Sequence, residues 1–140
     1  MIELMVVIVI LGIMVNFGMP RIYNASKDNV KDVSRKFINK VLDLKIQAVR
    51  EQKSLELIID FENNSLNSFK LPEDVYLMDL QRPDGEKEST DKSIVRFFKN
   101  GFSDYVAIHL ENDDGEQTTL VVEPFLEKVR LYNEYKELGD

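Results

Sequence analysis

The chain begins with an apolar run that follows a single acid, and this run constrains the fold more than any other feature. From Leu4 to Val15 only Gly12 is not strongly apolar, and Glu3 stands directly before the run. A helix rises about 1.5 Å per residue, so about sixteen apolar residues cover roughly 24 Å of a hydrocarbon layer about 30 Å thick. The run therefore predicts an apolar helix of marginal length for a transmembrane span.

Two other interpretations of this run fit less well. A secretory signal peptide carries positive charge before its apolar stretch and small residues at a cleavage site after it. This chain instead begins Met-Ile-Glu and continues from the run into Pro20 and Arg21. A buried core helix is usually amphipathic, whereas this segment is apolar on all sides, which suits lipid or a bundle of like helices.

A second helical pattern, of a different kind, covers residues 27–53. Its apolar residues recur every three or four positions and charged residues occupy the other side, which predicts an amphipathic helix packed on a domain. The core-facing positions are Val30, Val33, Phe37, Val41, Leu44 and Ala48, and a flanking row of Ile38, Leu42, Ile46 and Val49 widens the apolar face. We expect one long helix over about residues 2–53, kinked or locally melted at Gly18 and Pro20.

The remainder, residues 54–135, alternates apolar and polar side chains with period two and predicts an antiparallel sheet. The strand candidates are 55–61, 66–71, 74–80, 94–98, 104–110, 117–123 and 128–135. Residues 81–93 are polar and contain Pro83 and Asp84-Gly85, which predicts a mobile loop. Residues 111–116 contain Asp114-Gly115, a pair typical of a tight hairpin turn.

Several kinds of site are absent from the sequence. The net charge of −7 argues against nucleic acid as a partner, because phosphate binding needs a basic surface. The chain has no cysteine, and His109 is its only histidine, so we expect a structural role for His109 and no metal. The acidic residues 111–116 lack the spacing of a calcium loop. We find no catalytic constellation and no cofactor motif, so we expect a protein that is not an enzyme.

The N-terminal sequence IELMVVIVILGI, residues 2–13, with Pro20 seventeen residues after Glu3, resembles the mature N-terminus of type IV pilins and of the pseudopilins of type II secretion. Residues 97–135 are similar to the H-type minor pseudopilin. The resemblance implies an α+β pilin-like fold, in which a long N-terminal helix packs on a C-terminal antiparallel sheet. Residues 1–26 would be the transmembrane or filament-core segment, and residues 27–140 a periplasmic domain.

The same resemblance implies a structural role in secretion. The chain would be a minor pseudopilin held in the bacterial inner membrane by a single span and then assembled into the periplasmic pseudopilus tip. Its partners would be other pseudopilins, the inner-membrane secretion platform, the prepilin peptidase and, before assembly, membrane lipid. Processing by that peptidase implies a basic leader, ending in glycine, encoded upstream of Met1. The alternatives are a minor pilin of a type IV pilus and a membrane-anchored periplasmic binding domain.

The resemblance also assigns roles to residues of the first helix. Leu4, Val7, Ile8 and Leu11 would pack between subunits, and Gly18 and Pro20 would form the kink. A lone carboxylate inside hydrocarbon costs several kcal/mol, so Glu3 should lie at an interface or meet a cation. In the family that cation is the N-terminal amine of the adjacent subunit, which would set the axial register. The simpler alternative is that Glu3 marks the water boundary of an anchor.

Overall fold

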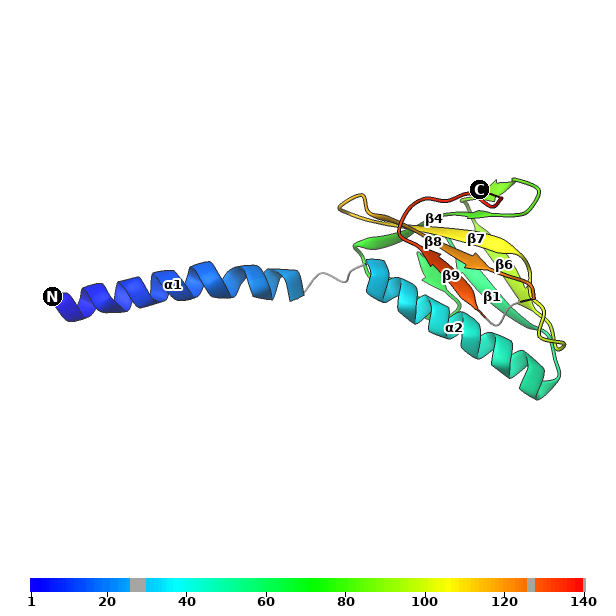
Figure 1. Ribbon diagram of the computed structural model, residues 1–140, viewed down its shortest axis with the longest axis horizontal. Coiled ribbons are helices and arrows are strands. Elements are labelled where there is room, and N and C mark those ends of the chain that lie inside the picture. Colours follow the sequence, from blue (N-terminus) through cyan, green and yellow to red (C-terminus); the bar gives the residue numbers. More distant parts are fainter. Residues whose placement is uncertain (26–29, 126–127, 140) are drawn as a thin grey trace.

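The computed structural model describes residues 1–25, 30–125 and 128–139, and the side chains of residues 14–25 lie outside this description (Figure 1). The helices are α1 (Ile2–Ala25) and α2 (Val30–Glu51). The strands are β1 (Leu55–Asp60), β2 (Ser65–Leu66), β3 (Phe69–Lys70), β4 (Val75–Gln81), β5 (Lys87–Glu88), β6 (Lys92–Phe97), β7 (Val106–Asn112), β8 (Gln117–Val122) and β9 (Val129–Tyr132). The described part of the chain is therefore two helices followed by strands.

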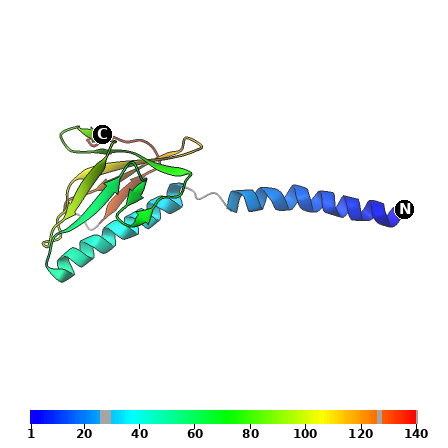
Figure 2. The same ribbon diagram turned by 180° about the vertical axis from the view of Figure 1, so that it is seen from behind.

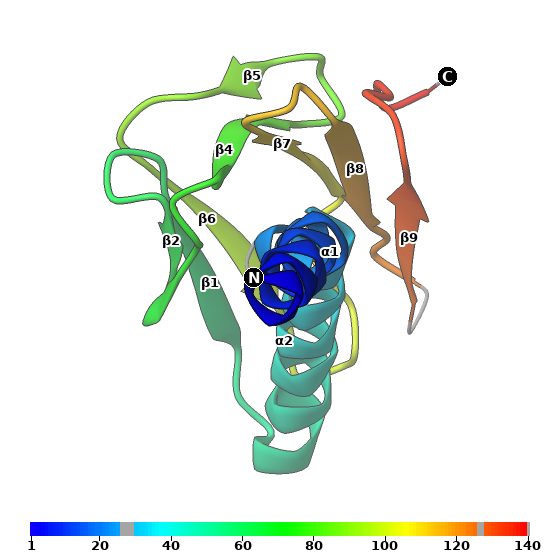
Figure 3. The ribbon, with the colours of Figure 1, turned by 90° about the vertical axis from the view of Figure 1, so that its left-hand side faces the viewer.

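The strands form two antiparallel sheets. One has the order β3-β2-β1-β6 and the other the order β5-β4-β7-β8-β9. Seen along α1, β1 and β6 lie on one side of α2 and β8 and β9 on the other (Figure 3). Helix α2 packs on strands of both sheets, and this arrangement places the core between the helix and the two sheets.

The core side of α2 is the stripe that the residue spacing predicts. Its buried apolar residues are Val30, Val33, Phe37, Val41, Leu44 and Ala48. They face buried side chains of both sheets, among them Leu57 and Phe97 in the first sheet and Ile108 and Leu120 in the second. Burying one such side chain contributes about 1.5–3 kcal/mol, so the stripe is a principal stabilising contact between the sheets.

The predicted fold class, a long helix packed on a sheet, is wrong. Helix α1 ends at Ala25 and α2 begins at Val30, and strands in two sheets make up most of the domain. The physical reason lies in the sequence between the helices: the stripe of α2 begins at Val30, while residues 24–29 read NASKDN and contain no large apolar residue. The buried core contains no residue of the described part of α1.

Smaller predictions for the sheet also change. The expected strand 66–71 is two short strands, β2 and β3, and the expected loop 81–93 contains β5 and the first residues of β6. The pairing of β1 with β6 joins residues that are more than thirty positions apart, such as Leu57 with Val95. Such pairing depends on tertiary packing and cannot be read from local alternation.

The predicted location, in the inner membrane with a single span, is also wrong. Among the described residues, no helix has both the length and the apolar character needed to cross a membrane. The physical reason is the one that made the span marginal: the apolar run is shorter than the hydrocarbon layer.

Replacing Phe37 tests the role of α2 as the contact between the sheets. Phe37→Ala should lower the free energy of unfolding by about 3–5 kcal/mol, because the ring is fully buried and its removal leaves a cavity. Urea unfolding of the full chain, followed by circular dichroism, measures this change. Ile46→Ala on the same helix is the matched control and should change stability by less than about 0.5 kcal/mol, because Ile46 is exposed. Equal losses for the two variants would contradict the packing scheme.

Candidate assembly surfaces

The first surface is the described part of α1. Its large apolar side chains between residues 2 and 13 are at least half exposed, and Ile2 reaches 81 %. Helix α1 projects away from the domain (Figure 1), and the view from behind shows the same separation (Figure 2). Contiguous apolar surface of this extent marks a site of interaction in proteins of this size. We call the exposed side chains of residues 2–13 the α1 surface.

The predicted packing residues share one face of α1. Leu4, Val7, Ile8 and Leu11 follow the spacing i, i+3, i+4, i+7, and all four are exposed. The opposite face, which the sequence analysis did not single out, is also apolar and exposed. Its residues are Ile2, Met5, Val6, Val9 and Ile10. The same spacing rule, applied from Ile2, would have found this face.

The predicted register residue, Glu3, lies in the first turn of α1 and is exposed. A carboxylate at this position interacts favourably with the unpaired backbone N–H groups and the positive end of the helix dipole. Gly18 and Pro20 lie within the bounds of α1, and the predicted kink at these residues stays a prediction.

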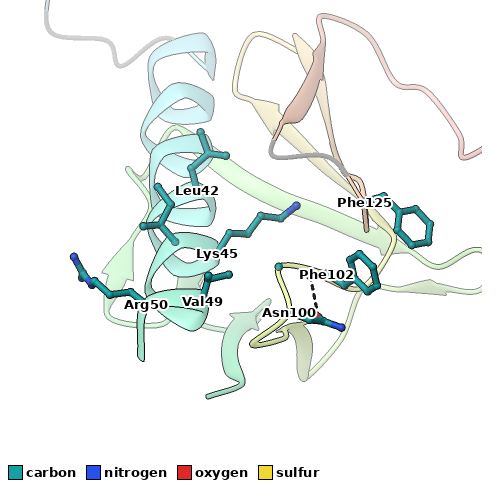
Figure 4. Close-up of a pocket in the computed structure, with 9 residues that line it drawn as sticks. Leu42, Lys45, Val49, Arg50, Asn100, Phe102 and Phe125 are labelled. Carbon is teal, nitrogen blue, oxygen red and sulfur yellow. Dashed lines mark hydrogen bonds between the residues drawn. The ribbon is translucent and has the colours of Figure 1, made fainter. Parts of the chain in front are cut away.

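The second surface is a groove of about 530 Å³ at the C-terminal end of α2. Its lining includes Leu42, Ile46 and Val49 of α2. Phe102 and Phe125 lie across the groove from Leu42 and Val49 (Figure 4). The two rings make an edge-to-face contact, with centroids 5.0 Å apart and planes at 81°. We call this feature the α2 groove. The sequence analysis noted the row on α2 but missed the opposite wall, because Phe102 and Phe125 meet only in the folded chain.

The turn that carries Phe102 is held by its own backbone. The N–H of Phe98 donates to the carbonyl of Phe102 at 2.8 Å, and the N–H of Gly101 donates to the carbonyl of Phe98 at 3.0 Å. Gly101 has a φ of +88°, a conformation that favours glycine, and a Cβ placed there would lie 3.7 Å from Cγ2 of Val49. The turn therefore lies directly against α2 and closes the base of the groove.

A third feature is the environment of His109, which is fully buried. Its Nδ1 lies 2.6 Å from Oδ1 of Asp79, and its Nε2 lies 2.8 Å from the carbonyl oxygen of Lys136. Both partners are acceptors, so the ring satisfies both of them only as the doubly protonated imidazolium. The ring of Tyr135 stacks on it at 3.9 Å, and the Tyr135 hydroxyl donates to the other oxygen of Asp79.

This cluster holds the C-terminal segment against the second sheet. The hydroxyl of Thr119 donates to the carbonyl of Glu134 at 2.7 Å and accepts the N–H of Lys136 at 2.9 Å. Further along, the N–H of Leu138 donates to the side chain of Gln81 at 2.9 Å. With both of its nitrogens bonded to protein groups, His109 has a structural role here.

The acidic residues 111–116 form a turn. The side-chain oxygen of Asn112 accepts the N–H groups of Asp114 and Glu116 at 3.1 and 2.9 Å, and Gly115 has a φ of +82°. In the described ranges, no three acidic or histidine side chains are grouped so that they could hold a metal ion.

Comparison with known proteins finds no similar protein. No family model, no curated protein and no solved structure matches this chain.

The loss of folding stability at acid pH should depend on Asp79. Burial raises the pKa of Asp79, but the hydrogen bond and charge of His109, with the Tyr135 hydroxyl, outweigh it and hold that pKa below 3.8. A carboxyl with a lowered pKa in the folded state stabilises the fold above the unfolded value, and this contribution is lost as pH falls through the folded value. Wild-type protein should therefore lose more stability between pH 7 and pH 3 than Asp79→Asn does.

Urea midpoints at the two pH values measure this difference. Asp43→Asn, at an exposed position on α2, is the control and should keep the wild-type pH dependence. If the Asp79→Asn variant loses as much stability between pH 7 and pH 3 as the wild-type protein, the cluster does not contribute to the loss at acid pH.

Proposed function

We propose that this chain is a structural subunit that assembles with like subunits through α1, as a minor pseudopilin of a type II secretion system. The single observation that carries the proposal is the α1 surface, an exposed apolar helix with one acid at its leading end. The proposed partners are other pseudopilins, the secretion platform and the prepilin peptidase. In this role the protein acts mechanically and is not an enzyme.

The energetics favour several helices over one pair. Burying the four packing residues Leu4, Val7, Ile8 and Leu11 gains about 6–12 kcal/mol at about 1.5–3 kcal/mol each. Association costs about 4–15 kcal/mol in lost translational and rotational freedom. One face of α1 therefore barely offsets the cost of association, and a stable assembly needs more than one apolar face or an additional charged contact.

Glu3 would fix the axial position of a helix contact that apolar side chains alone leave free to slide. Apolar helices can slide along one another with little change in energy, because each position offers similar contacts. A carboxylate that meets a cation in a poorly solvated contact is held at one position, since the attraction grows as the dielectric constant falls. The resemblance to pilins makes the N-terminal amine of a neighbouring subunit the expected cation.

A minor pilin of a type IV pilus would use the same contact. The net charge of −7 favours the secretion system over pili that take up DNA, because DNA binding calls for a basic surface.

Neutralising Glu3 tests the proposal. Glu3→Gln should weaken self-association of the full chain at least tenfold, or about 1.4 kcal/mol, because the register contact loses its charge. Sedimentation velocity over a range of concentrations measures the change. Glu62→Gln, an exposed acid between β1 and β2, removes the same charge from the domain and should leave association unchanged. Assembly of the Glu3→Gln chain at wild-type strength would reject a register role for Glu3.

A further inference from the structure

On the helix side of the α2 groove, apolar side chains are exposed. Leu42, Ile46 and Val49 follow one side of the helix at intervals of four and three residues, next to the buried stripe. Ile46 is 61 % exposed and Val49 is 42 % exposed. On the opposite wall, Phe102 is 45 % and Phe125 is 75 % exposed. Two apolar walls that face each other across a groove form the pattern to which an apolar helix binds.

The groove is formed before any partner binds. Lys45 extends from α2 toward the far wall (Figure 4), and its ammonium donates to the carbonyl of Glu123 at 2.9 Å. The hydroxyl of Ser103 donates to the same carbonyl at 3.2 Å. These bonds tie α2, the end of β8 and the turn beside Phe102 together, so little ordering is required of the groove when it binds.

The charges at the groove select an acidic partner. Its two ionisable lining residues, Lys45 and Arg50, are both cations. The Lys45 ammonium bonds to the backbone carbonyl of Glu123, whereas the Arg50 guanidinium is exposed, interacts with the charge of Glu51 and points outward from the end of α2 (Figure 4). The fitting occupant is thus an apolar helix that carries a carboxylate near one end.

The face of α1 that contains Ile2, Val6 and Ile10 has these properties. Ile2 to Ile10 and Leu42 to Arg50 are both intervals of eight residues, and each is about 12 Å long at the helical rise. Glu3 lies at the start of the first interval and Arg50 at the end of the second. Placing these charges together makes α1 antiparallel to α2, with Val6 beside Ile46.

We infer that the α2 groove binds α1 of a second copy of this chain, antiparallel to α2, with Glu3 of that copy paired to Arg50. This inference rests on the proposed function and deepens it: it names the contact surface, and it makes Arg50, in place of the N-terminal amine of a neighbouring subunit, the cation that Glu3 meets. Within one chain, α1 does not reach the α2 groove of that same chain. Helix α1 precedes the N-terminal end of α2 and is directed away from it, while the groove lies at the C-terminal end of α2 (Figures 1 and 2).

Disulfide trapping tests the contact directly, because the chain has no cysteine of its own. One full-length copy carries Val6→Cys and a second, of different tag size, carries Ile46→Cys. After mild oxidation the mixed disulfide should form at least ten times more than with a copy that carries Glu62→Cys, an exposed site far from the groove. Equal yields would overturn the inference. So would a chain with both Val6→Cys and Ile46→Cys that closes its disulfide within a monomer.

Charge reversal provides a second measurement at exposed positions. Glu3→Arg and Arg50→Glu should each weaken self-association at least tenfold, and the chain with both changes should regain most of it. If association depends on Glu3 but not on Arg50 or Ile46, the groove is not the contact, although the proposed function stands. If the full chain does not self-associate at all, the inference fails, although the proposed function, which also names other pseudopilins as partners, stands.

Discussion

The packing of the buried stripe of α2 against both sheets is the contact on which the domain depends. Within the described ranges the two sheets share no strand pairing, and α2 contacts strands of each of them. Phe37 and Val41 are fully buried where these layers meet. Because α2 packs on both sheets, the surface features beside this helix depend on how it packs on them. The α2 groove is one such feature, since its floor is the approach of Gly101 to Val49.

The two helices of this chain differ in how their apolar surface is satisfied. Helix α2 buries one face in the domain and leaves a flanking row exposed, while the described part of α1 leaves its apolar side chains exposed on all sides. The hydrophobic effect favours covering both. The proposed assembly between copies would cover both at once, and the acid of α1 and the guanidinium of Arg50 would give it a direction. The domain and the proposed assembly therefore depend on the same helix.

Much of the candidate site could be predicted from the sequence, because its signals are local. The α1 surface follows from an apolar run, and the two rows of α2 follow from helical spacing. The second wall of the groove could not be predicted, since Phe102 and Phe125 are joined by a contact across 23 positions. The cluster around His109 could not be predicted either, because Asp79 and Tyr135 come from different strands and segments. The expectation of one helix on one sheet failed because helical periodicity does not say whether a packing surface exists.

The sequence by itself determined which parts of the chain form helices and which form most of the strands, which side of α2 is apolar, and that a single acid precedes the apolar run. These properties depend on residues a few positions apart, so a pattern in the chain is sufficient to predict them. The tertiary structure alone decided that the strands divide into two sheets, and that an apolar groove with a cationic edge forms at the end of α2. Each of these depends on which distant surfaces meet, and such meetings are settled by the packing of the whole chain.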